Sequence, residues 1–445
     1  MKPQILISAA TAGSGKTLFA MGLLRALRKR GFKVQPYKCG PDFIDSQYLS
    51  IAADNESVNL DVWMSSNTHV QHIYNKYGEL ADICVTEGVG GLFDGYRRMQ
   101  GSTAEIAGLL NLPVILLVNA RIAGYSVAPL IYGFKNFYAG VRIAGVIFNQ
   151  VSSVAHYTYL REACSDVGVD CLGYLPNLEE FKLPSKHNVI SVANRRNLDE
   201  QADAIALKIE KTIDINRLTN RCSRNFPCPY TLPYCYDSDN DSFHSPVRKI
   251  KIAIARDPVF NFTYRENIAK LTQIGDIVHF SPLYGYDLPE ADLIYLPGGY
   301  PELFARQLHR RRRMMESLKE YAENGGKILA ECGGMVFLGR TLKSKENGTA
   351  YAMSNILPID FIMPSIQKPF SGYRKLSGSD WEMKGAEFHY STILNDDTPH
   401  TDWVTVPITN WKGAENNILF YRYKNVIASY AHWYWGDKNI LNLWQ

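Results

Sequence analysis

Short apolar runs alternate with amphipathic stretches along the first half of the chain. Segments with apolar residues at helical spacing, such as Leu18–Arg30 and Thr103–Leu110, stand between runs rich in Ile and Val. Four of these runs have the length of buried strands: Gln4–Ala9, Ile83–Thr86, Val114–Val118 and Ala144–Asn149. The alternation predicts a parallel sheet that helices cover on both faces.

The alternation stops in the stretch 214–247. This stretch is rich in proline and cysteine and carries the polar run Asp237–Asp241, a composition typical of an interdomain linker. A second series of strand-like and helix-like segments follows it: Lys251–Ala255, Glu266–Ile274, Ile277–Phe280, Leu293–Leu296 and Ile328–Ala330. We therefore predict two three-layer α/β domains, residues 1–213 and 248–445, joined by the linker 214–247.

Composition excludes several classes of protein. The chain has 445 residues, 46% of them hydrophobic, and a formal net charge of +4. This small surplus does not indicate nucleic-acid binding, which requires a clustered basic excess. The N-terminus lacks an apolar stretch with a cleavage site, and no segment is long and uncharged enough to span a membrane. We expect a cytoplasmic protein whose cysteines stay reduced.

The first strand runs directly into a phosphate-binding pattern, Ala10–Thr17, that opens a helix. It has Ala10 where the standard P-loop has its first glycine but keeps the Gly-Lys-Thr ending. The loop glycines let backbone amides face phosphate oxygens, the lysine neutralises them, and the threonine hydroxyl suits Mg²⁺. A glycine-rich turn that only caps the helix is the alternative, which the strand–loop–helix context disfavours. The predicted ATP-binding residues here are Gly13, Ser14, Gly15, Lys16 and Thr17.

Two further strands end in segments that carry acidic residues. Lys38, Asp42 and Asp45 follow one strand, and Glu87 and Asp94 follow another. Residues just past the carboxyl ends of parallel strands converge on the ligand crevice of an open sheet, so these side chains are expected to lie near the phosphates. Turns and helix caps are the alternative roles for such acids.

Cys332 stands between the strand Ile328–Ala330 and a glycine pair. Small residues two positions before and after it, Ala330 and Gly334, permit the sharp turn of a nucleophile elbow. The amide of Gly333 is placed to stabilise an oxyanion, and Gly298 and Gly299 follow another strand as a second source of amides. A buried structural cysteine is the alternative. The thiol needs a base, and sequence spacing does not choose between His389 and His432.

Together these segments resemble the cobyrinic acid a,c-diamide synthase family, whose members join a dethiobiotin-synthetase-like ATP domain to a class I glutamine amidotransferase domain. The resemblance implies a P-loop NTPase-like parallel sheet in the first domain and a mixed sheet of the amidotransferase type in the second. Its segments cover almost the whole chain outside the linker, in the family's order: the P-loop, Lys38–Asp45, Asn59–Met64, Glu87–Gly95, Gly101–Ala104, Gly145–Val151, Leu183–Pro184, Ala255–Asp257, Leu296–Glu302, Ala330–Gly334, Glu387–Ser391 and Ser429–His432.

The resemblance implies a reaction at two sites. Cys332, with His432 as its base, would release ammonia from L-glutamine through a glutamyl thioester. ATP would phosphorylate the c and a acetate carboxylates of cobyrinic acid, and ammonia would displace the phosphate. Lys16 and Lys38 would bind ATP.

The remaining roles follow from the same resemblance. Thr17, Asp45 and Glu87 would hold Mg²⁺, and Asp42 and Asp94 would order the acyl-phosphate site or the substrate. His389 is a candidate second active-site histidine. The implied partner is a corrinoid or related tetrapyrrole polycarboxylate, and a homodimer is compatible with the family.

Several positions depart from the family. Most class I amidotransferases carry a glutamate two residues after the histidine, where this chain has Tyr434, so a Cys–His pair without a third member is expected. Ser46 and Leu49 replace a common proline and histidine. These departures leave other substrates open, namely hydrogenobyrinate or nickel-sirohydrochlorin, as well as a cobyric acid synthase. A regulatory or partitioning P-loop ATPase with an inert second domain is the alternative from a different class.

Overall fold

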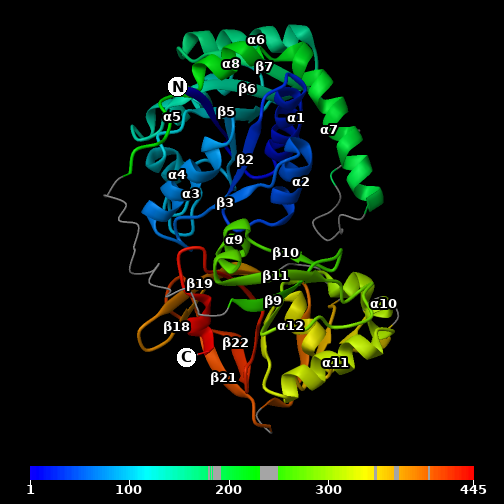
Figure 1. The fold of residues 1–445 in the computed structure, drawn as a ribbon. Coiled ribbons are helices and arrows are strands. Elements are labelled where there is room, and N and C mark those ends of the chain that lie inside the picture. The colour runs from blue at the N-terminus through cyan, green and yellow to red at the C-terminus, as the bar shows by residue number, and fades with distance from the viewer. Residues whose placement is uncertain are drawn as a thin grey trace. The chain divides into compact units, whose positions relative to one another are not determined.

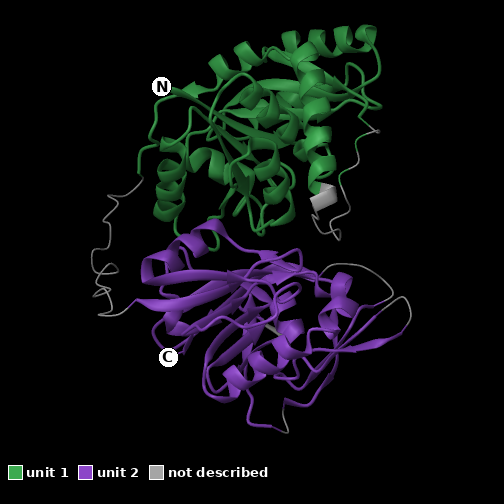
Figure 2. Cartoon of the chain, turned by 45° about the vertical axis from the view of Figure 1, so that its right-hand side comes forward, with its two compact units in different colours: residues 1–234 green, residues 235–445 purple. Residues whose placement is uncertain are grey.

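The structure is a computed structural model that describes residues 1–178, 181, 183, 192–230, 249–344, 348–364, 370–398 and 401–444. The chain forms two compact units, Met1–Tyr234 and Cys235–Gln445 (Figure 2).

The first unit is built on a parallel sheet with the strand order β3-β2-β4-β1-β5-β6-β7. The strands are β1 (Lys2–Ala9), β2 (Val34–Cys39), β3 (Val58–Leu60), β4 (Ile83–Glu87), β5 (Val114–Asn119), β6 (Ile143–Val151) and β7 (Cys171–Pro176). Nearly all residues of the central strands are buried, as expected for a sheet covered on both faces. The expected P-loop NTPase-like parallel sheet is confirmed.

Helices follow the strands and cover this sheet (Figure 1). They are α1 (Lys16–Lys29), α2 (Ile44–Ala53), α3 (Asn67–Glu79), α4 (Thr103–Leu109), α5 (Val127–Asn136), α6 (Val154–Asp166), α7 (Val192–Thr212) and α8 (Ile215–Arg221). Helices α1, α2 and α7 pack against one another. Because β4 and β5 flank β1, and β2 lies beyond β4, the loops after β1, β2 and β4 meet at one edge of the sheet.

The first part of the predicted linker belongs to the first unit. Residues 214–230 include α8 and β8 (Ser223–Arg224), which pairs antiparallel with β1. Cys222 and Cys228 are buried, and the Cys228 amide donates a hydrogen bond to the Asn75 side chain at 2.9 Å. Pairing with β1, apolar burial and the hydrogen bond to Asn75 of α3 attach residues 214–230 to the first unit. Residues 231–248 lie outside the described part of the chain.

The second unit contains a ten-stranded sheet in the order β11-β9-β12-β14-β23-β22-β21-β18-β19-β24. The strands from β11 to β23 run parallel and the rest antiparallel, so the expected mixed sheet is confirmed. In sheet order the strands are Gly275–Phe280, Ile250–Ala255, Leu293–Leu296, Lys327–Glu331, Val426–Ser429, Glu415–Tyr423, Val404–Asn410, Phe370–Ser377, Glu382–His389 and Ala431–Tyr434.

Smaller elements complete this unit. Strands β10 (Phe260–Phe262) and β13 (Gly298–Gly299) pair with each other. A four-stranded sheet consists of β15 (Thr341–Lys343), β16 (Ala350–Ala352), β17 (Ile359–Ile362) and β20 (Thr392–Asp396). Among the described residues of this unit, the helices are α9 (Arg265–Ile274), α10 (Ala305–His309), α11 (Arg312–Glu323) and α12 (Gly333–Leu338), with 3₁₀ turns at Pro301–Phe304 and Ile440–Trp444.

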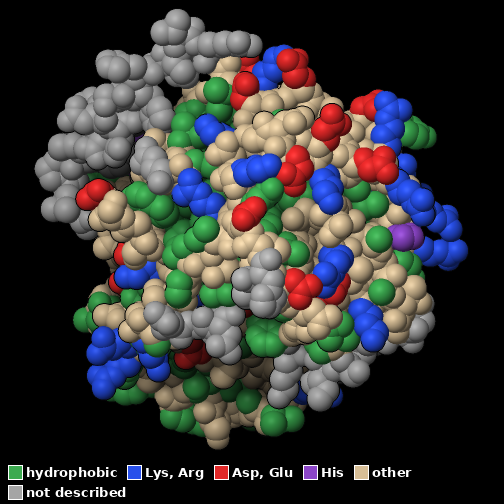
Figure 3. Space-filling view, turned by 90° about the horizontal axis from the view of Figure 1, so that it is seen from below, with side chains coloured by type: hydrophobic (Ala, Val, Ile, Leu, Met, Phe, Trp, Pro, Cys, Tyr) green, Lys and Arg blue, Asp and Glu red, His purple; other side chains and the backbone are tan. Residues whose placement is uncertain are grey.

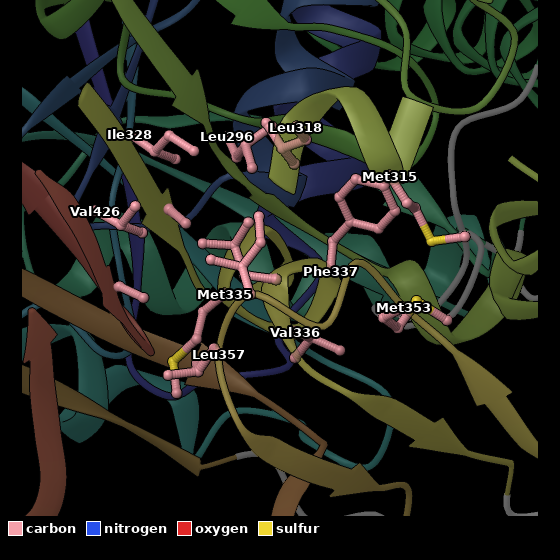
Figure 4. Close-up of a cluster of buried hydrophobic side chains, with 14 of the residues drawn as sticks. Leu296, Met315, Leu318, Ile328, Met335, Val336, Phe337, Met353, Leu357 and Val426 are labelled. Atoms are coloured by element: carbon pink, nitrogen blue, oxygen red, sulfur yellow. The ribbon is translucent and has the colours of Figure 1, made fainter. Parts of the chain in front are cut away.

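Alternate residues of the central strands enter two different apolar clusters. Ala253 and Ala255 pack into one cluster, whereas Ile252 and Ile254 pack into the other. The sheet is therefore covered on both faces. Figure 4 shows the first cluster, where Met335, Val336 and Phe337 of α12 lie among side chains from the surrounding strands and helices. This packing fixes the start of α12.

Charged side chains of both signs are scattered over the face shown in Figure 3. Most of the Arg310–Arg313 run is exposed at the start of α11, with Arg313 paired to Asp287. Within the described residues, no helix has both the length and the apolar character needed to cross a membrane.

Candidate active sites

The loop between β1 and α1 has the backbone shape of a phosphate cradle. Gly13 and Gly15 adopt left-handed conformations, with φ of 74° and 90°. A Cβ at Gly15 would lie 2.3 Å from Nδ2 of Asn149, which donates a hydrogen bond to the Ser14 carbonyl at 2.9 Å. Gly15 is thus required both by its conformation and by the close approach of Asn149 from β6.

Lys16 connects this loop to the loop after β4. Its Nζ donates hydrogen bonds to the Gly90 carbonyl at 2.5 Å and the Thr11 carbonyl at 3.4 Å. Burial lowers the pKa of Lys16, and the attraction of Glu87 offsets part of that effect. The amine is therefore held at the mouth of the loop by two carbonyl groups, contacts that an incoming anion would replace with a stronger, charge-assisted one.

A buried cluster of charges lies beside the P-loop. Lys38 Nζ is 2.9 Å from Asp45 and 3.1 Å from Glu87, and the Thr17 hydroxyl donates to Glu87 Oε1 at 2.7 Å. Burial acts to lower the pKa of Lys38, but the attraction of Glu87, Asp45 and Asp42 outweighs it and raises that pKa. Burial also raises the pKa of Glu87, against the effect of Lys38. Lys38 is the second-to-last residue of β2, so its side chain starts at the carboxyl end of that strand, where the loops of the site meet.

The residues predicted to hold Mg²⁺ form part of this cluster. Thr17 and two carboxylates offer hard oxygen ligands, and Oε2 of Glu87 is buried without a hydrogen-bond partner among the described residues. Across all the residues that the structure describes, no group of three or more His, Cys, Asp and Glu side chains has the spacing to hold a metal ion by itself. The donor set fits Mg²⁺, which takes most of its ligands from water and nucleotide phosphates.

Asp42 and Asp94 make local contacts in their loops. Asp42 Oδ1 accepts hydrogen bonds from the backbone amides of Ile44 and Asp45 at the start of α2. Asp94 Oδ2 accepts one from the Gly91 amide at 2.9 Å. Such helix-cap and turn contacts are the alternative role that the sequence left open for these two acids, beside a role at the substrate. Both side chains lie in the loops that meet at the P-loop edge of the sheet.

Cys332 has the strained backbone of a nucleophile elbow. It joins β14 to α12 with φ 46° and ψ −104°, an uncommon conformation for a residue with a side chain. A Cβ at Gly334 would lie 2.1 Å from the Leu296 carbonyl, so only glycine permits α12 to start this close to β12. The strain is sustained by the core packing of α12 seen in Figure 4.

Backbone amides surround the thiol. Burial raises the pKa of Cys332, and nearby Glu302 adds to that effect, whereas the amides of Gly333 and Gly299 lower it. Two amides from separate loops thus face the sulfur, the arrangement required to stabilise an oxyanion beside it. Gly298 also packs closely against the base, since a Cβ there would lie 2.0 Å from Cε1 of His432.

His432 and Cys332 approach the same backbone carbonyl. The Cys332 thiol contacts the Phe388 carbonyl at 3.5 Å, and the Phe388 backbone also lies close enough to His432 to favour its protonated form. Burial and the neighbouring His389 outweigh that effect and lower the pKa of His432 to about 3. The imidazole is therefore neutral at physiological pH, the state in which it accepts a proton.

His389 is fixed in a network of its own. Its Nε2 lies 2.6 Å from Glu387, which also pairs with Arg374, and its Nδ1 lies 2.7 Å from the Ser391 carbonyl. The ring stacks on Tyr430 with 3.7 Å between centroids. Because both ring nitrogens of His389 have partners, this residue stabilises the end of β19, where Phe388 contacts the Cys332 thiol.

Glu331 is a further acidic residue beside His432 that no sequence motif marked. Oε2 of this residue lies 4.0 Å from Nδ1 of His432, and Oε1 accepts a hydrogen bond from the Trp433 amide at 2.9 Å. The position two residues beyond His432, where most class I amidotransferases carry a glutamate, is Tyr434. A better signal was available, because an acidic residue at the end of the apolar run Ile328–Ala330 requires a buried polar partner.

Two family profiles match the chain. The CobQ/CobB/MinD/ParA nucleotide-binding domain matches residues 5–190, and the CobB/CobQ-like glutamine amidotransferase domain matches residues 251–440. A cobyrinate a,c-diamide synthase of Dehalococcoides mccartyi is 36% identical over 457 aligned residues, covering 98% of this chain and 95% of that protein. The chain belongs to the cobyrinate a,c-diamide synthase family.

Other members of the family match over similar lengths. The synthase of Saccharolobus solfataricus is 34% identical and that of Priestia megaterium 33% identical, with alignments that cover 96% and 98% of this chain and 97% and 94% of theirs. Family membership makes the chain a ligase that takes its amido group from glutamine and has a nucleotide-binding domain. The alternative of a regulatory ATPase with an inert second domain is thereby excluded.

Proposed function

We propose that this chain amidates the a and c acetate carboxylates of cobyrinic acid, with ATP as the activating reagent and glutamine as the source of ammonia. The proposal rests on the relatives matched over nearly their whole length, which bear the name of this activity. In support, the chain retains a side-chain set for each half-reaction. Ser46, Leu49 and Tyr434 differ from common family residues, so related tetrapyrroles such as hydrogenobyrinate belong in the test.

Glutamine hydrolysis is assigned to Cys332. His432 takes the thiol proton, and the sulfur attacks the side-chain carboxamide of glutamine to form a tetrahedral intermediate. The amides of Gly299 and Gly333 stabilise its oxyanion. His432 then returns the proton to the leaving nitrogen, ammonia departs, and water hydrolyses the glutamyl thioester. Because His432 is neutral in its buried setting, it begins each cycle in the basic form.

Carboxylate activation is assigned to the P-loop edge of the first unit. Backbone amides of Gly13–Gly15 and the amine of Lys16 bind the nucleotide phosphates. Thr17, Asp45 and Glu87 would hold Mg²⁺, which neutralises phosphate charge when bound. Lys38, fixed between two carboxylates, contributes a positive charge at the same place. A substrate carboxylate attacks the γ-phosphorus, ADP leaves, and ammonia displaces phosphate from the acyl phosphate. Asp42 and Asp94 order the loops around this site.

The proposal is tested by mass spectrometry after incubation with ATP, glutamine and a panel of tetrapyrrole polycarboxylates. Cobyrinic acid should undergo two successive replacements of hydroxyl by amino groups, whereas the other macrocycles should react more slowly. Two replacements on hydrogenobyrinate or nickel-sirohydrochlorin alone would reassign the substrate. More than two replacements on one corrinoid would indicate a cobyric acid synthase, and no replacement on any macrocycle would refute the proposal.

A further inference from the structure

Glu331 occupies an unusual position for a carboxyl group. It is the last residue of β14, directly before Cys332, and its side chain is 1% exposed. Burial raises the pKa of Glu331 to about 8, although the hydrogen bonds from Trp433 and Tyr295 lower it. Burying a carboxyl group at the centre of a sheet is unfavourable, so a hydrophobic residue would stabilise this strand better unless the carboxyl has a task.

The contacts of Glu331 join the strands that carry the two reacting side chains. Oε1 accepts the backbone amide of Trp433, the residue after His432, at 2.9 Å. Oε2 accepts the hydroxyl of Tyr295 from β12 at 2.7 Å and lies 4.0 Å from Nδ1 of His432. One carboxyl group therefore fixes the backbone beside the base and also faces its ring.

We propose that Glu331 is the positioning residue for His432. It sets the ring relative to Cys332 and stabilises the imidazolium that forms when the thiol proton moves to the ring. The inference rests on the proposed glutaminase role of Cys332 and His432. The position two residues after His432 is Tyr434 and not an acid. Glu331, which directly precedes Cys332 on a different strand, supplies the acidic group near His432 instead. The 4.0 Å separation shortens to a hydrogen bond by a small rotation, as catalytic contacts do once substrate is bound.

A purely structural role makes a different prediction. If Glu331 only fastens β24 through the Trp433 amide, glutamine in its place preserves that contact, because the carboxamide oxygen accepts the same hydrogen bond. If the negative charge of Glu331 stabilises the imidazolium, glutamine removes that charge while keeping the shape of the side chain, and glutamine hydrolysis is impaired. Glu331→Gln therefore separates the two roles.

The charge balance around the ring determines the sign of a pH effect. Among the described residues, the titratable groups that face His432 are Glu331 from β14 and His389 from β19. Tyr295 faces Glu331 from β12, and the Cys332 thiol, with Glu302 nearby, lies at the Phe388 backbone that also acts on His432. Because burial raises the pKa of Glu331 to about 8, the group is mostly neutral at rest, and a positive ring 4.0 Å away favours its ionisation. The resulting carboxylate favours the imidazolium, and the imidazolium in turn favours the thiolate. Loss of the carboxylate should shift the alkylation of Cys332 to higher pH.

The experiment measures three quantities on the full chain with Glu331→Gln. These are the kcat and KM of glutamine hydrolysis, the pH dependence of Cys332 alkylation by iodoacetamide followed by peptide mass spectrometry, and the thermal unfolding of the second unit. Tryptophan fluorescence reports that unfolding, because Trp63 is the single tryptophan of the first unit. Glu323→Gln is the matched control, since it removes an exposed carboxylate paired with Lys424 in the same unit.

We expect E331Q to lower kcat for glutamine hydrolysis by about tenfold or more, within the range of general-base contributions, with KM changed less than kcat. Alkylation of Cys332 should require a higher pH, and the control should match the wild type. A kcat within about twofold of wild type, or an unshifted alkylation profile, would overturn the inference.

The design also distinguishes failure of the inference from failure of the proposed function. If the wild type itself hydrolyses no glutamine, the proposed function fails. If the wild type is active and E331Q is equally active, only the role of Glu331 fails. Should E331Q lose its cooperative unfolding transition, Glu331→Asp provides the same readings. It keeps the carboxyl group but withdraws it from the ring by one methylene, so kcat should fall and alkylation should require a higher pH; a kcat and an alkylation profile equal to those of the wild type would count against the inference.

Discussion

Gly298→Ala should impair glutamine hydrolysis while leaving the rest of the molecule intact. A Cβ at this position would lie 2.0 Å from Cε1 of His432, whereas real Cβ contacts almost never fall below 3.0 Å. The ring or the loop must therefore move by about 3.0 − 2.0 = 1.0 Å. His432 is fully buried and faces Glu331, Phe262 and the Phe388 backbone, so little room exists for that movement.

A displacement of this size has a predictable cost in rate. Misplacing a catalytic group by about 1 Å costs on the order of 10²-fold in rate, and overpacking a buried site costs about 1–3 kcal/mol of stability. We expect kcat for glutaminase to fall on the order of 10²-fold and the tryptophan-detected melting temperature to fall modestly. Synthesis from free ammonia should persist, because it does not use His432.

The assay follows glutamate release and, separately, ammonia-dependent amidation. Gly133→Ala serves as the control, since a Cβ there meets nothing within 4 Å and the residue lies within α5; both of its activities should match the wild type. Glutaminase activity in G298A within about threefold of wild type would refute the geometry that places His432 against this loop.

Three further predictions concern the separate sites. Cys332→Ser should abolish glutaminase yet retain ammonia-dependent synthesis, whereas Lys16→Ala should abolish synthesis from either nitrogen source and spare glutaminase; a folded C332S variant that loses both activities would contradict two separate half-sites. Lys38→Met leaves two buried carboxylates without their cation, so the free energy of unfolding of the first unit should fall by about 3–5 kcal/mol, measured by urea denaturation with circular dichroism, and an unchanged midpoint would exclude the buried ion pairs. His432 has a depressed pKa, so between pH 6.5 and about 3 the unfolded state binds a proton that the folded state does not. The stability that neutral His432 contributes is therefore lost as pH falls. From pH 7 to pH 4, the free energy of unfolding of the wild type should fall relative to that of His432→Gln; a difference independent of pH would contradict the buried neutral ring.

Local rules predicted the features that depend on neighbours in sequence. The P-loop between β1 and α1 and the elbow at Cys332 were both recognised, because their glycines and small residues are required by backbone geometry within a few positions. The parallel sheet of the first unit followed from buried Ile and Val runs, and the mixed sheet of the second from the family resemblance.

Features that depend on tertiary contacts were harder to predict. The role of Glu331 depends on β24 returning beside β14 from a hundred residues away, which no local pattern reveals. The segment 214–230 resembled a linker by composition, yet its cysteines are buried against the first unit. The convergence of Lys38, Asp45 and Glu87 was expected from their positions just past parallel strands, but the direct ion pairs of Lys38 with both carboxylates depend on the tertiary fold.

The central claim is that one chain transfers the amide nitrogen of glutamine to two carboxylates of a corrinoid. The most direct measurement uses glutamine labelled with ¹⁵N in its side-chain amide, together with ATP and cobyrinic acid, and analyses the corrinoid by mass spectrometry. The account predicts a product with two new amides that both carry the label in the wild type, and none from glutamine in C332S. A diamide without the label, or labelled ammonia released with the corrinoid unchanged, would contradict it.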